Sequence, residues 1–151
     1  MQVREILAIK GAVLYTIAPS KTLAEGIAIM TEQDVGSLVC FAGGRMVGML
    51  TFREVLKAIN EHGANAGERN IDGVMVRDPK TTAPDMEVDD LRRLMIESHM
   101  RYLPVMDGAT LMGVISFHDV AKAVLDAQGF ENRMLKAYIH DRPAEEEGGV
   151  Q

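Results

Sequence analysis

Two short stretches of the sequence place a hydroxyl and an acid three residues apart. They are Thr51 with Glu54 and Ser116 with Asp119, each following a glycine and two apolar residues. An apolar pattern of helical spacing comes after each pair. A hydroxyl and an acid at this spacing form a capping box, which stabilises a helix start by about 1 kcal/mol and requires no ligand. Capping is therefore the simplest role for either pair alone.

The residues around these pairs favour a second role. Arg53 and His118 stand directly before the two acids, and Arg101 and Tyr102 come just before another apolar strand pattern. A capping box needs no cation, whereas a phosphate site does. The N-terminus of a helix attracts phosphate through its free N–H groups and its dipole, and an acid there can accept hydrogen bonds from both hydroxyls of a ribose. If the two helix starts face a shared cleft, the set suits a nucleotide better than an inorganic anion.

The two pairs belong to a longer internal repeat. The interval from Thr51 to Ser116 equals the interval from Glu54 to Asp119. Between Thr16 and Val55 the first half aligns with the second without a gap. Apolar spacing and turn residues predict strand, helix, strand, strand and helix in each half. In the first half the segments are an extended stretch at 12–17, a helix at 22–33, a hairpin at 37–41 and 46–50, and a helix from Phe52.

Segments outside the repeated pattern complete the expected organisation. Residues 3–9 predict a short amphipathic helix that ends at Gly11, and the polar stretch 61–69 predicts a loop between the halves. Gly129 separates the last repeated helix from a further amphipathic helix. The expected division is 1–66 for the first repeat, 67–128 for the second, and 129–151 for a C-terminal helix with an acidic disordered tip. Because each half is small, we expect the two to pack their sheets face to face about a pseudo two-fold axis.

Composition excludes several classes of function. The chain of 151 residues has a net charge of −6 and no basic cluster, which argues against a general binder of nucleic acids or anionic membranes. No signal peptide and no apolar run of about 20 residues is visible, so a cytoplasmic protein is expected. The one cysteine, Cys40, lies in an apolar run and is expected to be a buried small hydrophobe. No nucleophile–base pair and no glycine-rich phosphate loop is recognisable. The histidines lack partners at metal-ligand spacing; they are His62, His99, His118 and His140.

With these features together, the sequence resembles a pair of CBS (cystathionine-β-synthase-type) domains, the Bateman module. The resemblance covers about residues 3–126 and rests on the paired glycine–apolar–apolar–hydroxyl–x–x–acid motifs, on Leu103-Pro104-Val105 before the Asp107-Gly108 turn, on the turns at Pro19 and Pro84, and on the duplication. It implies an α/β (α+β) fold of two β-α-β-β-α repeats. It also implies clefts that often hold AMP, ADP, ATP, S-adenosylmethionine or NAD(H), and dimers that form a flat disc.

The resemblance also implies roles for individual residues. Asp119 matches the ribose-binding acid and Ser116 the hydroxyl beside it, Arg101 and Tyr102 match phosphate-contacting positions, and Met100 and Val35 match apolar residues that cover the adenine. Main chain near Tyr15 and Lys80 would contact the adenine edge. Arg53 fits a basic residue of the family motif that holds Thr51, and His118 occupies the equivalent place in the second motif. In the first repeat the acid is Glu54 rather than aspartate, and Gly36-Ser37 stands where the second repeat has Arg101-Tyr102.

Two functions from different classes follow from this interpretation. The first is a stand-alone regulatory module, without catalysis and without a required metal, that binds an adenine nucleotide (AMP, ADP, ATP or NAD(H)) and signals to an effector protein by a conformational change. The second is a structural or interaction protein whose clefts hold no ligand. Glu54 and the small Gly36-Ser37 pair favour the second function for one cleft, and the cleft at Asp119 is the stronger candidate for binding. A homodimer is expected in both cases.

Overall fold

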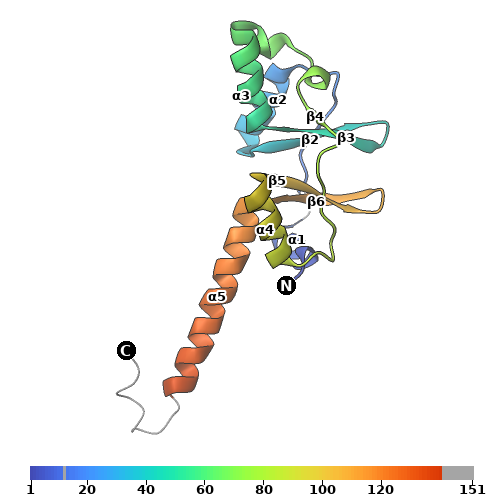
Figure 1. Ribbon diagram of the computed structural model, residues 1–151. Helices are drawn as coiled ribbons and strands as arrows, with labels where there is room; N and C mark the ends of the chain where they lie inside the picture. Colours follow the sequence, from blue (N-terminus) through green and yellow to red (C-terminus); the bar gives the residue numbers. More distant parts are fainter. Residues whose placement is uncertain (12, 141–151) are drawn as a thin grey trace.

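The computed structural model describes residues 1–11 and 13–140, with side chains to residue 137. Two modules of helices and strands lie one above the other, and a long helix extends away from the lower module (Figure 1). The elements are α1 (Val3–Lys10), β1 (Thr16–Ile17), α2 (Leu23–Gln33), β2 (Ser37–Ala42), β3 (Arg45–Thr51), α3 (Phe52–His62), η1 (Gly63–Glu68), η2 (Ile71–Gly73), β4 (Val76–Arg77), α4 (Val88–Ser98), β5 (Tyr102–Asp107), β6 (Thr110–Ser116) and α5 (Phe117–His140).

The strands form two sheets of unequal size. The first has the order β1-β2-β3-β4, with β1 parallel to β2 and the other pairs antiparallel, and the second consists of the antiparallel hairpin β5-β6. Equivalent strands β3 and β6 contact each other between the modules. A contact between two equivalent elements is what a pseudo two-fold relation requires. The predicted α/β (α+β) architecture of two β-α-β-β-α repeats is confirmed.

The pairing of strands in the second half repeats that of the first half, shifted by the interval that separates Thr51 from Ser116. Ile17 pairs with Cys40 in the first half, and their equivalents Thr82 and Val105 pair in the second. Both pairs are parallel, although in the second half the contact is an isolated bridge rather than a strand. Both hairpins also carry an irregularity at the same place, between Cys40 and Phe41 and between Val105 and Met106.

Each hydrophobic core contains residues from the segment that precedes the other repeat in the sequence. Val3 and Ile6 of α1 are buried in the core of the second repeat with Val88 and Leu91, whereas Ile71 is buried in the core of the first repeat. Two glycines, one in β3 and one in β6, leave room for side chains of these segments. The Sδ of Met75 would lie 2.8 Å from a Cβ added at Gly48, and Leu7 approaches Gly113 in the same way at 3.3 Å. Each repeat is therefore completed by a segment that precedes the other repeat. The boundaries of the repeats predicted from the sequence remain a prediction. They do not coincide with the two hydrophobic cores, because each core includes a segment that precedes the other repeat.

Three expectations about local structure differ from what is observed. In the stretch 61–69, expected as a loop, α3 continues to His62 and residues 63–68 form the 3₁₀ helix η1. Within the described part of the expected extended stretch, residues 13–17, the strand is limited to Thr16–Ile17. The break expected at Gly129 is wrong, because α5 continues through it to His140. One glycine costs a helix only about 1 kcal/mol relative to alanine, so the favourable residues on both sides carry the helix across.

The expected acidic tip at 141–151 lies outside the described residues. Within the described part, no helix is both long and apolar enough to cross a membrane.

Candidate functional site

A cavity of about 1030 Å³ lies between the two repeats. Its wall is made by the segment before β1, by the turns that follow α2 and α4, and by the junction of β6 with α5. The volume is in the range of small-molecule sites, which are usually lined by apolar groups with a few polar ones. The lining residues are Lys10, Val13, Leu14, Tyr15, Gln33, Asp34, Val35, Gly36, Ser37, Met95, Ile96, His99, Met100, Arg101, Tyr102, Val114, Ser116, Phe117, His118 and Ala121.

Two equivalent helix ends shape opposite sides of this cavity. Asp34 ends α2 and His99 ends α4, at matching positions of the two repeats, and both have the left-handed backbone conformation, with φ of 52° and 55°. Their N–H groups bond back to the last turn of each helix. Aspartate and histidine are among the few residues besides glycine that adopt this conformation with some frequency. The left-handed residues turn the chain sharply, so that Val35 and Met100, which follow them, face the cavity.

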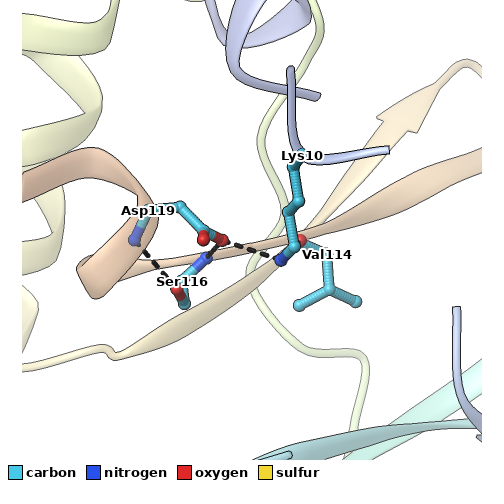
Figure 2. Close-up of polar contacts among 4 residues, drawn as sticks. All are labelled: Lys10, Val114, Ser116 and Asp119. Carbon is cyan, nitrogen blue, oxygen red and sulfur yellow. Dashed lines mark hydrogen bonds and ion pairs between the residues drawn. The ribbon is translucent and has the colours of Figure 1, made fainter. Parts of the chain in front are cut away.

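The start of α5 lies at the cavity wall and carries the second capping box. The Ser116 Oγ accepts a hydrogen bond of 3.0 Å from the Asp119 N–H, and an Asp119 carboxylate oxygen, Oδ2, accepts one of 2.9 Å from the Ser116 N–H. The same Oδ2 accepts a second hydrogen bond, from the Lys10 ammonium at 2.7 Å. Lys10 comes from the end of α1 and also donates to the Val114 carbonyl at 2.8 Å. Figure 2 shows Lys10 meeting β6 and α5 at this point.

The environment of Asp119 keeps this carboxyl ionised. Burial alone would raise the pKa of Asp119, but the hydrogen bond from Lys10, the hydrogen bond from the Ser116 amide and the charge of Lys10 together lower it below its ordinary value. A charged donor and a backbone N–H both favour the carboxylate form over the acid form. Asp119 and Lys10 are therefore a formed ion pair at neutral pH, one that joins the N-terminal helix to the second repeat.

The first capping box has the same form but a different place. Glu54 accepts hydrogen bonds from the Thr51 N–H at 2.9 Å and from the Thr51 hydroxyl at 2.7 Å, and only 8% of the residue is exposed. Thr51, Arg53 and Glu54 do not line the cavity described above. The expectation that both helix starts open on one shared cleft therefore differs from the structure, in which this cavity takes in the start of α5 alone.

Most of the residues predicted to bind ligand come together in this cavity. Its wall contains Tyr15, Val35, Ser37, Met100, Arg101, Tyr102, Ser116 and His118. Asp119 lies behind the wall, in contact with Ser116 and Lys10, which both form part of it. Lys80 is exposed and lies elsewhere, as do the three residues of the first capping box. The roles of all these residues in binding remain predictions.

Sequence reasoning missed Lys10, Asp34, His99 and Phe117, which also line the cavity. Lys10 had a signal in the sequence, because the repeat loses its register near Lys10-Gly11 and so marks a segment with its own role. Asp34 and His99 could have been paired by the constant interval of the repeat. Their left-handed conformation, which places them at the cavity, depends on how each helix ends and is not visible in apolar spacing.

Neither a metal site nor a reactive thiol is found among the described side chains. Among the side chains that the structure describes, no three from histidine, cysteine, aspartate and glutamate gather as a metal site. Cys40 is fully buried in the first core, and its predicted role as a small hydrophobe is confirmed. Burial, followed by the nearby charge of Glu54, raises the pKa of the Cys40 thiol to about 12. A thiol with this pKa is protonated at neutral pH and is a poor nucleophile.

Comparisons with known proteins agree with this architecture. A 17.7 kDa protein from Acidianus ambivalens is 32% identical over 143 residues, which are 91% of this chain and 78% of that protein. The crystal structure of a CBS-domain-containing protein from Agrobacterium tumefaciens superposes with a TM-score of 0.78 at 26% identity, over 82% of this chain and 98% of that one. The CBS domain pair of protein MJ0100, solved with 5′-methylthioadenosine and S-adenosyl-L-methionine, gives 0.73 at 20% identity, over 84% and 98%. The family model "CBS domain" matches twice, at residues 3–61 and 70–126, and the chain therefore belongs to the CBS domain family as a tandem pair.

Proposed function

We propose that this protein is a regulatory module that binds an adenine nucleotide (AMP, ADP, ATP or NAD(H)) in the cavity between its two repeats and signals to an effector protein in the cytoplasm. The observation that carries the proposal is the composition of the cavity wall. Both repeats contribute to it, so a ligand that contacts Tyr15 on one side and Arg101 on the other bridges them. A ligand that binds one relative placement of the repeats better than another shifts the population toward that placement.

The polar groups at the start of α5 support a ligand with both a sugar and phosphates. Ser116 and His118 lie on the wall at this helix start, and Arg101 lies on the same wall. Asp119, directly behind Ser116, is an ionised acceptor of the kind that can bind two ribose hydroxyls. Arginine together with the N-terminus of a helix suits a phosphate group. Tyr102 and Met100 add an aromatic and an apolar surface for a flat base.

Family membership supports an adenosine compound in particular. The CBS pair of protein MJ0100 was solved with two such compounds. At 20% identity that structure shows a shared fold, so the choice of ligand here depends on this chain's own residues. We propose no reaction for the cavity, and the nucleotide would act as a regulatory ligand rather than as a substrate.

One observation favours the second candidate, a ligand-free interaction protein. Glu54 already uses one carboxylate oxygen on both donors of Thr51 and is almost fully buried. An acid held in this way stabilises its helix and has little surface left for a ribose. We propose that the first repeat's motif is structural and that ligand binding uses the motif at Asp119.

We further propose that the protein is a homodimer. Large apolar side chains are exposed along α3 and α5, including Phe52 and Leu56 on the former and Leu125 on the latter, with exposed fractions of 54%, 67% and 65%. Large apolar side chains exposed on several helices are typical of an interface with another protein. Sedimentation equilibrium at micromolar concentration would measure the mass of the assembly, and a monomer at that concentration would contradict the proposal.

The binding proposal can be tested by thermal unfolding. The purified protein is heated with AMP, ADP, ATP or NADH, after any molecule that co-purifies has been released and identified by mass. At a ligand concentration about 100 times Kd, binding adds about 2.7 kcal/mol, which raises Tm by roughly 5 °C or more in a chain of this size. Asp119→Ala should remove the rise, because it removes the proposed acceptor for the ribose.

A matched control separates binding from a general change of charge. Asp126→Ala removes a carboxylate from an exposed position of the same helix, outside the cavity wall, and should keep the full rise in Tm. If none of the four nucleotides changes Tm at millimolar concentration and no bound molecule is found, the ligand-free interpretation is correct.

A further inference from the structure

The ammonium group of Lys10 is the feature of the cavity that the proposed function leaves without a role. Its side chain crosses from α1 to the second repeat, where Nζ lies 2.7 Å from the Asp119 Oδ2 and 2.8 Å from the Val114 carbonyl oxygen. These three residues come from three different elements, and Lys10 is separated from Asp119 by 109 positions in the sequence. Such a contact is not a consequence of local helix geometry.

Lys10 covers the acid that a ribose would have to reach. Lys10, Val114 and Ser116 all belong to the cavity wall, whereas Asp119, which two of them contact, does not. The Asp119 side chain is 17% exposed, and that of Lys10 is 35% exposed. A ligand in the cavity therefore meets the ammonium group before it meets the carboxylate.

Both groups have bonding capacity left for a ligand. An ammonium group has three N–H donors, and Lys10 uses two of them within the described structure. The contacts of Asp119 with Lys10 and with the Ser116 amide both go to Oδ2, which leaves Oδ1 as the less occupied oxygen. Ribose hydroxyls can bond to Oδ1, but full use of the carboxylate by a diol requires Lys10 to move aside.

The charge left behind decides which ligand can displace Lys10. An ammonium moved away from its carboxylate loses a charge-assisted hydrogen bond and needs another anion. The acid that does line the cavity wall, Asp34, belongs to the opposite repeat, at the end of α2. A neutral nucleoside offers hydroxyls to Asp119 and nothing to Lys10. A ligand with a phosphate on the same sugar offers both partners at once.

Resting on the function proposed above, we propose that Lys10 makes this cavity select adenosine compounds that carry a negatively charged 5′ group. Before binding, Lys10 neutralises Asp119; on binding, the ribose hydroxyls take over the carboxylate and Lys10 passes to the phosphate. Arg101 and His118 on the same wall add to phosphate binding but do not contact Asp119. Lys10 is thus the residue that couples recognition of the sugar to recognition of the charge.

The test is a selectivity ratio measured by calorimetry. The dissociation constants of AMP and adenosine are determined for the wild-type protein and for Lys10→Met, which keeps the length of the side chain and removes its charge. The ratio of the adenosine Kd to the AMP Kd should fall about tenfold or more in the variant, since a charge-assisted hydrogen bond is lost for AMP alone. Lys10→Arg, which keeps the charge, should retain the ratio within about threefold of wild type.

Controls make the outcomes distinct. Lys122→Met removes the same charge from an exposed position on α5, outside the cavity wall, and should leave the ratio unchanged. Lys10→Gln repeats the measurement if the methionine variant does not fold. If AMP binds the wild type and the ratio stays within about twofold in Lys10→Met and Lys10→Gln, the selectivity role is wrong while the proposed function stands. If another of the four nucleotides binds in place of AMP, it replaces AMP in the ratio. If none of AMP, ADP, ATP, NADH and adenosine binds the wild type, both proposals are overturned.

Discussion

The phenol of Tyr102 lies directly against the Cα of Gly36. A Cβ added at Gly36 would overlap the Tyr102 hydroxyl and would lie 2.9 Å from the Cε2 of Phe52. Gly36 belongs to the first repeat and Tyr102 to the second, and both line the cavity. The residue that corresponds to Gly36 in the second repeat is Arg101. The small residue that distinguishes the first repeat is therefore what allows an aromatic side chain of the second to cross over and form the cavity wall.

Gly36→Ala should destabilise the protein by about 1–3 kcal/mol, because the added methyl forces Tyr102 from its place. Urea unfolding measures the change. Gly73→Ala is the matched control, since a Cβ there meets nothing within 4 Å and the change should be less than about 0.5 kcal/mol. Replacing Tyr102 by alanine in the Gly36→Ala background should recover part of the loss. Equal effects of the two glycine variants would show that Tyr102 does not occupy this position.

The repeated elements could be predicted from the sequence because their signals are local. Apolar spacing and the glycine turns predicted both hairpins closely. The interval between Thr51 and Ser116 also separates the parallel pair Ile17–Cys40 from its equivalent Thr82–Val105, although the pairing itself was not predicted. The capping boxes could be predicted for the same reason, since both partners of each box lie within one helical turn.

The rest depends on contacts between distant segments. Nothing in the composition of α1 says that Val3 packs in the core of the second repeat or that Lys10 reaches Asp119. The start of α3 has the same motif as the start of α5, yet it does not line the same cavity, and its Glu54 is almost fully buried and bonded to Thr51. The motif fixes how a helix begins, whereas the packing between repeats decides whether a ligand can reach it.

The Lys10–Asp119 pair should make stability depend on pH at the acid end. The pKa of Asp119 is lowered below its ordinary value of 3.8 in the folded protein, so its contribution is present above that value and is lost as pH falls through the lower, folded pKa. Asp119→Asn should cost about 1 kcal/mol at pH 7, allowing for partial exposure of Lys10. The gap between wild type and variant should narrow as pH falls below 3.8. Urea unfolding across this range measures it.

Asp126→Asn provides the control for this titration, because it removes one negative charge from an exposed site on the same helix. The difference between the two variants isolates the contribution of the ion pair. A cost of Asp119→Asn that has the same size at pH 7 and at pH 3 would mean that the carboxylate contributes no charge-dependent stability, and that Lys10 does not hold it.

Glu54→Ala should lower stability without affecting ligand binding. Removal of the carboxylate leaves the Thr51 N–H and hydroxyl without their partner in a nearly buried site, at a cost of about 1–3 kcal/mol. Glu25→Ala removes the corresponding acid of an exposed capping box, at the start of α2, and should cost about 0.5 kcal/mol. Thermal unfolding with and without AMP measures both effects. Loss of the AMP-induced rise in Tm in Glu54→Ala would show instead that the first motif takes part in binding.

Gly129→Ala should stabilise the centre of helix α5 against local unfolding. Gly129 is not among the residues with positive φ, and a Cβ there would meet only the flexible end of Arg133, at 3.5 Å. Alanine should therefore favour the helix by about 1 kcal/mol, seen as slower amide hydrogen exchange over residues 126–136. Gly129→Pro should break the helix and speed the exchange of the same amides. The sequence indicated two helices separated at Gly129. If the chain in solution turned there through a left-handed conformation, alanine would be the strained residue and exchange would become faster, so the sign of the change distinguishes one helix from two.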